Sequence, residues 1–174
     1  KDRLIDDDAR RRQGAFFTPA IWVDEAHKTL DEVLGPDWRD TCIVWDPAAG
    51  TGNLTRDYTF ADLIITTAEL SDVETIRSQD YNPGAVIEQY DFLNPDAPSP
   101  FLGGKINTLP PEIDKRLRAA AKAGKRLVFL MNPPYVEASV AGKQGKSREG
   151  VASSSAVAAC LRSMKTGRAS QQLY

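Results

Sequence analysis

Apolar residues recur along the chain at two different spacings, which predict helices and strands. Between residues 20 and 34 the apolar positions follow one helical face, and Gly35-Pro36 ends that pattern. Thr18 is predicted to cap this helix, with Pro19 at its first position. Short apolar runs predict strands at 42–45, 63–70, 85–90 and 127–131, and further helices are expected at 53–60, 74–78 and 112–123.

The last of these strands, at 127–131, is apolar throughout. Such a run is typical of a parallel strand that is covered on both faces. Strands that alternate with helices form a doubly wound parallel sheet, so the sequence predicts an α/β fold. A loop is expected at 94–111, a mobile glycine- and lysine-rich loop at 142–150, and a last helix at 153–164.

The length and composition fit one soluble globular domain. The 174 residues are 41% hydrophobic and 26% charged, which is a usual balance for a chain with a buried core. No stretch reaches the roughly 18 to 20 apolar residues of a membrane helix, and no apolar signal segment follows the charged first residues. We therefore expect a cytoplasmic protein.

The charge balance limits how the chain can contact a polyanion. A net charge of −2 argues against a wide phosphate-binding face. Basic residues cluster at 122–126 and 143–148. Two interpretations of these clusters have equal weight: contact with nucleic acid, or a surface exposed to solvent. Cys42 and Cys160 lack metal-ligand spacing; Cys42 is expected in a buried strand, and His27 at the surface of a helix.

Acidic residues stand where the first three predicted strands end. Asp46, Glu69 and Asp91 would line one rim, because parallel strands end at the same edge of a sheet, where doubly wound folds bind ligands. Gly50 and Gly52 turn the chain sharply and leave room for a nucleotide-like ligand, although a tight connection would also use glycine. Glu69 follows about twenty residues later. A carboxylate there can accept hydrogen bonds from both ribose hydroxyls. The alternative is that Glu69 is only a solvent-exposed residue at the end of a strand.

The fourth predicted strand runs into Asn132-Pro133-Pro134-Tyr135. The prolines remove two backbone donors and hold the chain extended, so carbonyl oxygens remain available to another molecule. The amide oxygen of Asn132 and the Pro133 carbonyl can accept the two hydrogens of an sp² amine, while Tyr135 offers its face to a flat ring. The alternative is a purely structural turn.

Together these segments resemble the amino-methyltransferase family, specifically the DNA adenine-N6 methyltransferases whose cofactor motifs precede the catalytic one. Residues 14–19 resemble the segment that contacts the methionine part of the cofactor, and 46–52 the glycine-rich motif. Glu69 matches the ribose-binding acid, Asp91-Phe92 the pair that meets the cofactor adenine, and 132–135 the catalytic motif. The resemblance implies a Rossmann-like, doubly wound sheet of the class I methyltransferase type.

The resemblance also implies S-adenosylmethionine as cofactor, S-adenosylhomocysteine as product, and no metal. The catalytic residues that it implies are Asn132, Pro133, Pro134 and Tyr135. The cofactor-binding residues that it implies are Phe17, Thr18, Asp46, Ala48, Gly50, Gly52, Asn53, Glu69, Leu70, Asp91 and Phe92. It implies that the target adenine leaves the duplex and that the methyl group is transferred directly. No cysteine stands at the catalytic position, so cytosine-C5 chemistry is not expected.

The chain differs from this family because some of the expected strands and the target-recognition domain are not found in its sequence. The class has more strands than the about four predicted here, so we expect a partial, truncated catalytic domain over 1–174. Whether this domain is active alone or only within a longer protein stays open. Its parts are an N-terminal cofactor-motif segment and helix at 1–40, the α/β core at 41–135, and a mobile loop and C-terminal helix at 136–174. No target-recognition domain is visible, so double-stranded DNA would be held by a domain elsewhere. The free edge of the fourth strand invites self-association.

Three interpretations of the function are therefore open. The preferred one is methylation of adenine N6 in DNA, within a restriction-modification or phage-defence protein. Methyltransferases that act on a protein glutamine or on a guanine amine in RNA also use an Asn-Pro-Pro-aromatic motif, although residues 16–19 favour DNA. The non-enzymatic alternative is a cofactor-free scaffold, which would not need the intact acidic, glycine and asparagine positions.

Overall fold

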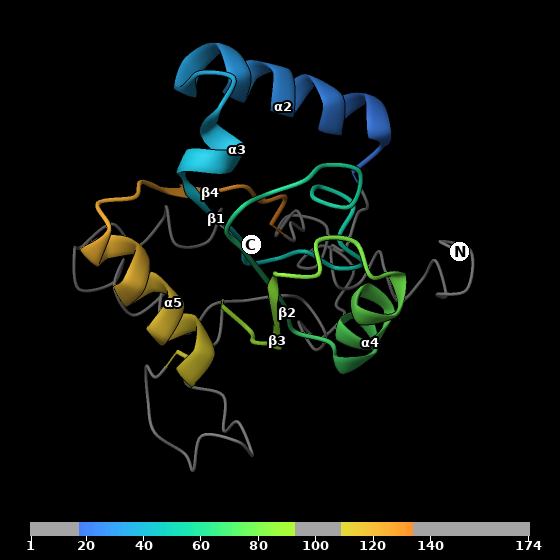
Figure 1. Cartoon of the computed structure of the whole chain (residues 1–174). Coiled ribbons are helices and arrows are strands. Elements are labelled where there is room, and N and C mark those ends of the chain that lie inside the picture. The colour runs from blue at the N-terminus through green and yellow to red at the C-terminus, as the bar shows by residue number, and fades with distance from the viewer. Residues whose placement is uncertain (1–17, 93–108, 134–174) are drawn as a thin grey trace, which may run out of the picture.

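The computed structural model describes residues 18–92 and 109–133, whose arrangement is shown in Figure 1. The helices are α2 (Ala20–Leu34), α3 (Trp38–Thr41), α4 (Leu70–Gln79) and α5 (Pro111–Lys122). The strands are β1 (Ile43–Asp46), β2 (Leu63–Thr67), β3 (Val86–Gln89) and β4 (Leu127–Phe129). From β2 onward, strands and helices alternate along the chain.

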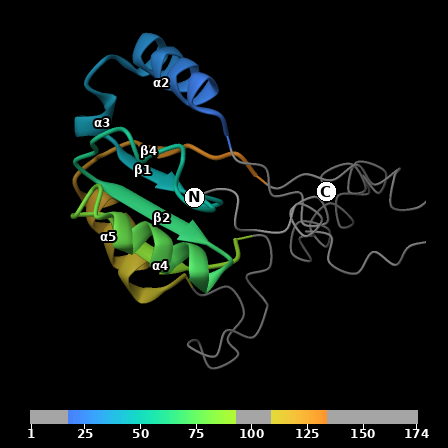
Figure 2. The same cartoon turned by 90° about the vertical axis from the view of Figure 1, so that its right-hand side faces the viewer.

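The four strands form one parallel sheet in the order β3-β2-β1-β4. Val44 of β1 lies opposite Leu63 of β2 on one side and opposite Val128 of β4 on the other. The chain runs outward from β1 to β3 and then returns through α5 to the free side of β1. The carboxyl ends of all four strands therefore share one edge, toward which the arrow of β2 points in Figure 2. The predicted α/β fold with a parallel sheet is confirmed.

Helices cover both faces of this sheet, and α4 and α5 flank the strands in Figure 1. One face packs against α2, α3 and α4 through the buried side chains of Val23, Trp38, Val44, Leu63, Ile65 and Ile76. The other face packs against α5 through Ile43, Trp45, Ile64, Ile113 and Ala120. Burial of each large aliphatic side chain contributes about 1.5 to 3 kcal/mol. These two layers hold the sheet and fix its carboxyl edge.

α2 has the predicted bounds, but its N-terminus differs from the prediction. Pro19, with φ −61° and ψ 147°, occupies the N-cap position, and no side chain caps the helix. Thr18 therefore lies one residue too early to cap. Its hydroxyl instead accepts a hydrogen bond of 3.1 Å from the side-chain amide of Asn132. Gly35, with φ 96°, ends the helix as predicted.

The helix predicted at 53–60 is wrong, because these residues form turns. A helix-type bond from Arg56 N to Gly52 O is made but does not continue as a helix. The side-chain nitrogen of Asn82 donates to the carbonyls of Thr55 and Tyr58 at 3.2 and 2.9 Å, so another segment uses these acceptors. Short polar side chains also favour turns over helix interiors. Within the described residues, no helix lies between β1 and β2.

The second and fourth predicted strands are shorter in the structure. β2 ends at Thr67, and α4 extends the helix predicted at 74–78 in both directions. The prediction that β4 is covered on both faces is wrong for the described part of the chain. Leu127 and Phe129 are 42% and 56% exposed. The reason is that α5 packs over side chains of β1 and β2 and not over those of β4.

His27, predicted at the surface of α2, is buried, with an exposed fraction of 1%. The turns at 53–60 bring Tyr58 against it, which a helix prediction for that segment could not anticipate. Cys42 is buried, as predicted, but it follows α3 and lies just before β1 instead of within it. Cys160 and the segments predicted at 142–150 and 153–164 lie outside the described residues. None of the described helices is long and apolar enough to cross a membrane.

Candidate functional site

The parallel sheet brings the predicted site residues to one edge. Asp46 ends β1, Glu69 follows β2, Asp91 follows β3, and Asn132 follows β4. The backbone nitrogen of Leu130 donates to the Trp45 carbonyl at 3.0 Å, so the chain after β4 runs beside the end of β1. The end of β4 therefore lies beside the end of β1, at the edge of the sheet from which the glycine turn starts.

Asp46 is fully buried at this edge. Its Oδ1 accepts a hydrogen bond of 3.3 Å from the backbone nitrogen of Ala48, one of the predicted cofactor residues. Its Oδ2 is buried and has no hydrogen-bond partner among the described residues. Burial raises the pKa of the carboxyl to about 7. A buried acceptor without a partner costs about 1 to 3 kcal/mol, so this oxygen is suited to a cationic donor or a proton.

The turn after β1 places both glycines in the left-handed region, at φ 53° for Gly50 and φ 83° for Gly52. A side chain at Gly52 would collide with the hydroxyl of Tyr81, which also donates to the Gly52 carbonyl at 3.5 Å. Burial raises the pKa of Tyr81 to about 12, so the phenol remains a donor. At Gly52 the structure thus places a protein side chain where sequence reasoning expected room for a ligand. Asn53 is engaged locally, accepting from Arg56 at 3.3 Å.

The end of β2 carries two acidic residues, of which sequence reasoning found one. Glu69 is exposed and is the N-cap residue of α4. Asp72, one turn later, accepts a hydrogen bond of 3.3 Å from the hydroxyl of Thr67. Burial raises the pKa of Asp72, and the nearby charge of Glu69 raises it further. The spacing of Glu69 and Asp72 by three residues at a helix start was the signal that could have found the pair. Leu70, between them, is 51% exposed.

The end of β3 continues the rim. Tyr90 N donates to the Thr67 carbonyl at 2.9 Å, which holds the chain against the end of β2. Asp91 and Phe92 follow directly and are both half-buried. Their position beside β2 agrees with a ligand that reaches across two strand ends.

Asn132 is tied to the start of α2. Its Nδ2 donates to Oγ1 of Thr18 at 3.1 Å, across 114 residues of chain. Pro133 is the last described residue of this segment; Phe17, Pro134 and Tyr135 lie outside the described residues. Among the residues that the structure does describe, no group of histidine, cysteine and acidic side chains could hold a metal ion.

The basic residues at 122–126 serve the fold in part. Lys125 pairs with Asp62 at 3.0 Å, and Arg116 of α5 pairs with the same carboxylate. Arg126 donates to the carbonyl of Leu34 at 3.3 Å. Lys125 and Arg126, two of the cations of this predicted cluster, are thus engaged within the domain.

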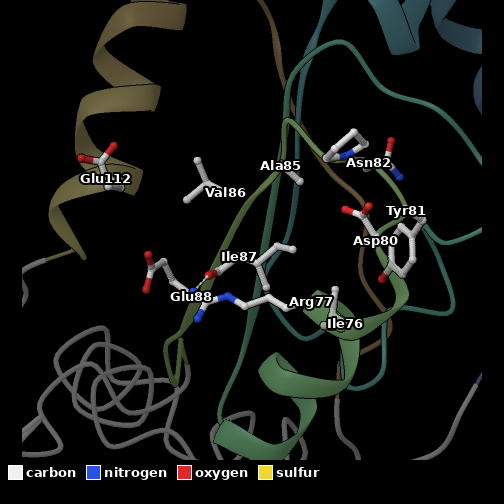
Figure 3. A pocket seen from close by; sticks show the side chains of 11 residues that line it. Ile76, Arg77, Asp80, Tyr81, Asn82, Ala85, Val86, Ile87, Glu88 and Glu112 are labelled. Carbon is white, nitrogen blue, oxygen red and sulfur yellow. Dashed lines mark hydrogen bonds between the residues drawn. The ribbon is translucent and has the colours of Figure 1, made fainter.

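A cavity of about 370 Å³ lies away from this rim, along the outer edge of β3 between α4 and α5 (Figure 3). None of the predicted site residues lines it. Figure 3 shows Arg77 directed to the backbone of Ile87, where its guanidinium donates to the carbonyl. This contact covers an outward acceptor of the edge strand, which protects the edge from pairing with another chain.

Comparisons of the chain with protein-family models, with curated proteins and with solved structures gave no match. The chemistry of the site must therefore be judged from its own residues.

Proposed function

We propose that this chain carries the cofactor-binding and catalytic residues of an S-adenosylmethionine-dependent methyltransferase that acts on the N6 amine of adenine in DNA. The observation that carries the proposal is the hydrogen bond between Thr18 and Asn132, which joins the predicted cofactor segment to the predicted amine acceptor. The strand order β3-β2-β1-β4 supports it, because Rossmann-like sheets are ordered in this way around their first strand. In such sheets the ligand binds where the strand order reverses, which is here between β1 and β4.

The side chains at this reversal suit the cofactor. The partnerless Oδ2 of Asp46 can accept a hydrogen bond from the ammonium of the methionine part. The exposed carboxylate of Glu69 suits the two ribose hydroxyls, and the exposed side chain of Leu70 suits the face of a flat ring. S-adenosylmethionine, when bound, supplies a methyl group on a positively charged sulfur.

Asn132 and Pro133 would act on the acceptor amine. The amide oxygen of Asn132 and the carbonyl of Pro133 accept its two N–H groups, which turns the nitrogen lone pair out of the ring plane and toward the methyl group. The nitrogen bonds to the methyl carbon as the carbon–sulfur bond breaks, its electron pair remains on sulfur, and one nitrogen proton passes to solvent. Such a direct transfer depends on positioning and electrostatics. Tyr135 remains the predicted stacking partner of the flipped adenine.

The substrate in this proposal is double-stranded DNA. With a net charge of −2 and part of its basic cluster engaged in the fold, the chain is expected to contribute few phosphate contacts. Most of the DNA-binding affinity and all base-specific contacts would come from a recognition domain of the same protein or of a partner. A restriction-modification or phage-defence protein of the cytoplasm would combine these parts.

Transfer of a tritiated methyl group tests the proposal. The chain, alone and within its full-length protein, is incubated with labelled S-adenosylmethionine and with unmethylated DNA, RNA or a release-factor-like protein. With the full-length protein we expect label in DNA, recovered as N6-methyladenine, and none with Asn132→Ala, which should keep most of the affinity for S-adenosylhomocysteine. Label only in RNA or protein would favour the other amine methyltransferases. Absence of S-adenosylhomocysteine binding by calorimetry would favour the scaffold.

A further inference from the structure

The hydroxyl of Thr18 does not cap the helix that follows it. A threonine just before a helix usually caps the helix, and this contributes about 1 kcal/mol. Here Pro19 takes the N-cap position and α2 has no side-chain cap. The Thr18 hydroxyl is instead bonded to Asn132, so a contact with the segment that follows β4 replaces the local one.

The contact constrains the direction of the Asn132 side chain. An amide is planar, and its nitrogen and oxygen point to different sides of the carbon that joins them. Because Nδ2 is directed to Thr18, Oδ1 is directed away from the start of α2. The backbone at Asn132 is itself restricted, since a proline follows it. Few rotations are then left to the amide.

We infer that Thr18 is a positioning residue: its hydroxyl holds the amide of Asn132 so that the oxygen faces the side from which a substrate amine enters. This inference rests on the proposed function. Without the hydroxyl, the side chain of Asn132 loses this hydrogen bond and can rotate away from its position beside Thr18. Its oxygen would then be displaced from the substrate amine that the native side chain accepts.

The orientation can be tested without any turnover. In the ¹⁵N-labelled chain, the two side-chain amide protons of Asn132 are assigned from their loss in Asn132→Ala. We expect one of them to be shifted and slow to exchange with water in the native chain and in Thr18→Ser, and to change its shift and exchange faster in Thr18→Val. Thr29→Val is the matched control, because among the described residues its hydroxyl bonds within α2, to the carbonyl of Glu25. Unchanged Asn132 signals in Thr18→Val would overturn the inference.

The catalytic consequence is measured at saturating cofactor. Thr18→Val should lower kcat by up to about 100-fold, as expected for a displaced reacting group, with a smaller change in KM for DNA. Thr18→Ser should restore most of kcat, and Thr29→Val should leave it unchanged. A Thr18→Val enzyme with native kcat and a loss only in cofactor affinity would overturn the positioning role. If the native protein transfers no methyl group at all, the proposed function fails, while the amide signals still decide whether Thr18 orients Asn132.

Discussion

The ring of His27 lies flat against the ring of Tyr58, with centroids 3.5 Å apart and planes within 3°. Both nitrogens of the imidazole are used. Arg39 can only donate, so its bond of 3.2 Å makes Nδ1 the acceptor, and Nε2 donates to the Leu54 carbonyl at 2.8 Å. A neutral His27 therefore ties α2 to the residues that follow the glycine turn.

Acidic pH should weaken the contact between His27 and the residues after the glycine turn, and with it the stability of the fold. Burial lowers the pKa of His27 below its ordinary value of 6.5; the Leu54 carbonyl raises it, Arg39 lowers it, and Asp31 and Asp24 raise it. The unfolded chain binds the proton more readily, so the stability that neutral His27 contributes is present above pH 6.5 and is lost as pH falls through that value toward the folded pKa. The urea midpoint should be lower at about pH 5.5 than at about pH 7.5.

His27→Gln provides the control for this effect. Glutamine can still donate to the Leu54 carbonyl but does not titrate, so the variant should be less stable at both pH values. The difference between the native chain and the variant should shrink as the pH falls. A constant difference would show that His27 does not sense pH.

Asp46 should give stability the opposite pH dependence to that of His27. Its pKa is raised by burial from 3.8 to about 7, so the stability that its protonated form contributes is fully present below pH 3.8 and is lost as pH rises through about 7. Asp46→Asn keeps an acceptor for the Ala48 nitrogen and removes the charge. We expect the variant to be more stable than the native chain at about pH 8, by a few kcal/mol at most, and not at about pH 5.

The same substitution should weaken the cofactor. If Asp46 accepts from the ammonium group, Asp46→Asn loses a charged hydrogen bond, which contributes about 1.5 to 3 kcal/mol. Calorimetry with S-adenosylhomocysteine should then show at least a roughly tenfold loss of affinity. If the variant is more stable but binds S-adenosylhomocysteine with native affinity, the Asp46 charge destabilises the fold and does not contribute to cofactor binding.

Gly52→Ala should destabilise the domain through two causes. Its φ of 83° is unfavourable for a side chain, and the new Cβ would meet the Tyr81 hydroxyl. Strain of about 1 to 2 kcal/mol and overpacking of about 1 to 3 kcal/mol should together lower the free energy of unfolding. Gly84→Ala is the matched control, because a Cβ at that position would have no neighbouring atom within 4 Å. Tyr81→Phe in the Gly52→Ala background should recover part of the loss; no recovery would mean that the contact with the hydroxyl is not its cause.

The sequence was sufficient for the parts of the fold that repeat a simple period. The apolar spacing of residues 20–34 predicts the body and the C-terminal end of α2, and the β-branched runs predict four parallel strands. Because parallel strands end together, the rim of Asp46, Glu69, Asp91 and Asn132 also followed from the sequence. What these residues bind stays a prediction.

Contacts between distant segments could not be predicted in this way. The turns at 53–60 depend on Asn82, which lies more than twenty residues away and takes the carbonyls that a helix would use. Those turns in turn bury His27, and Tyr81 fills the space above Gly52. Each of these outcomes is decided by a partner that local periodicity does not identify.

β4 carries the last prediction, because its edge differs from that of β3. Arg77 covers an outward carbonyl of β3, whereas in the described part of the chain the apolar side chains of Leu127 and Phe129 in β4 and of Met131 just after it are exposed. A second copy of the chain can cover this strip, since two identical edges can pair and bury both. Sedimentation should show dimers that increase with concentration, and Phe129→Lys should abolish them. Val33→Lys, at a side chain that is 73% exposed on α2, should not. A native chain that stays monomeric at high concentration would show that the β4 strip does not mediate self-association.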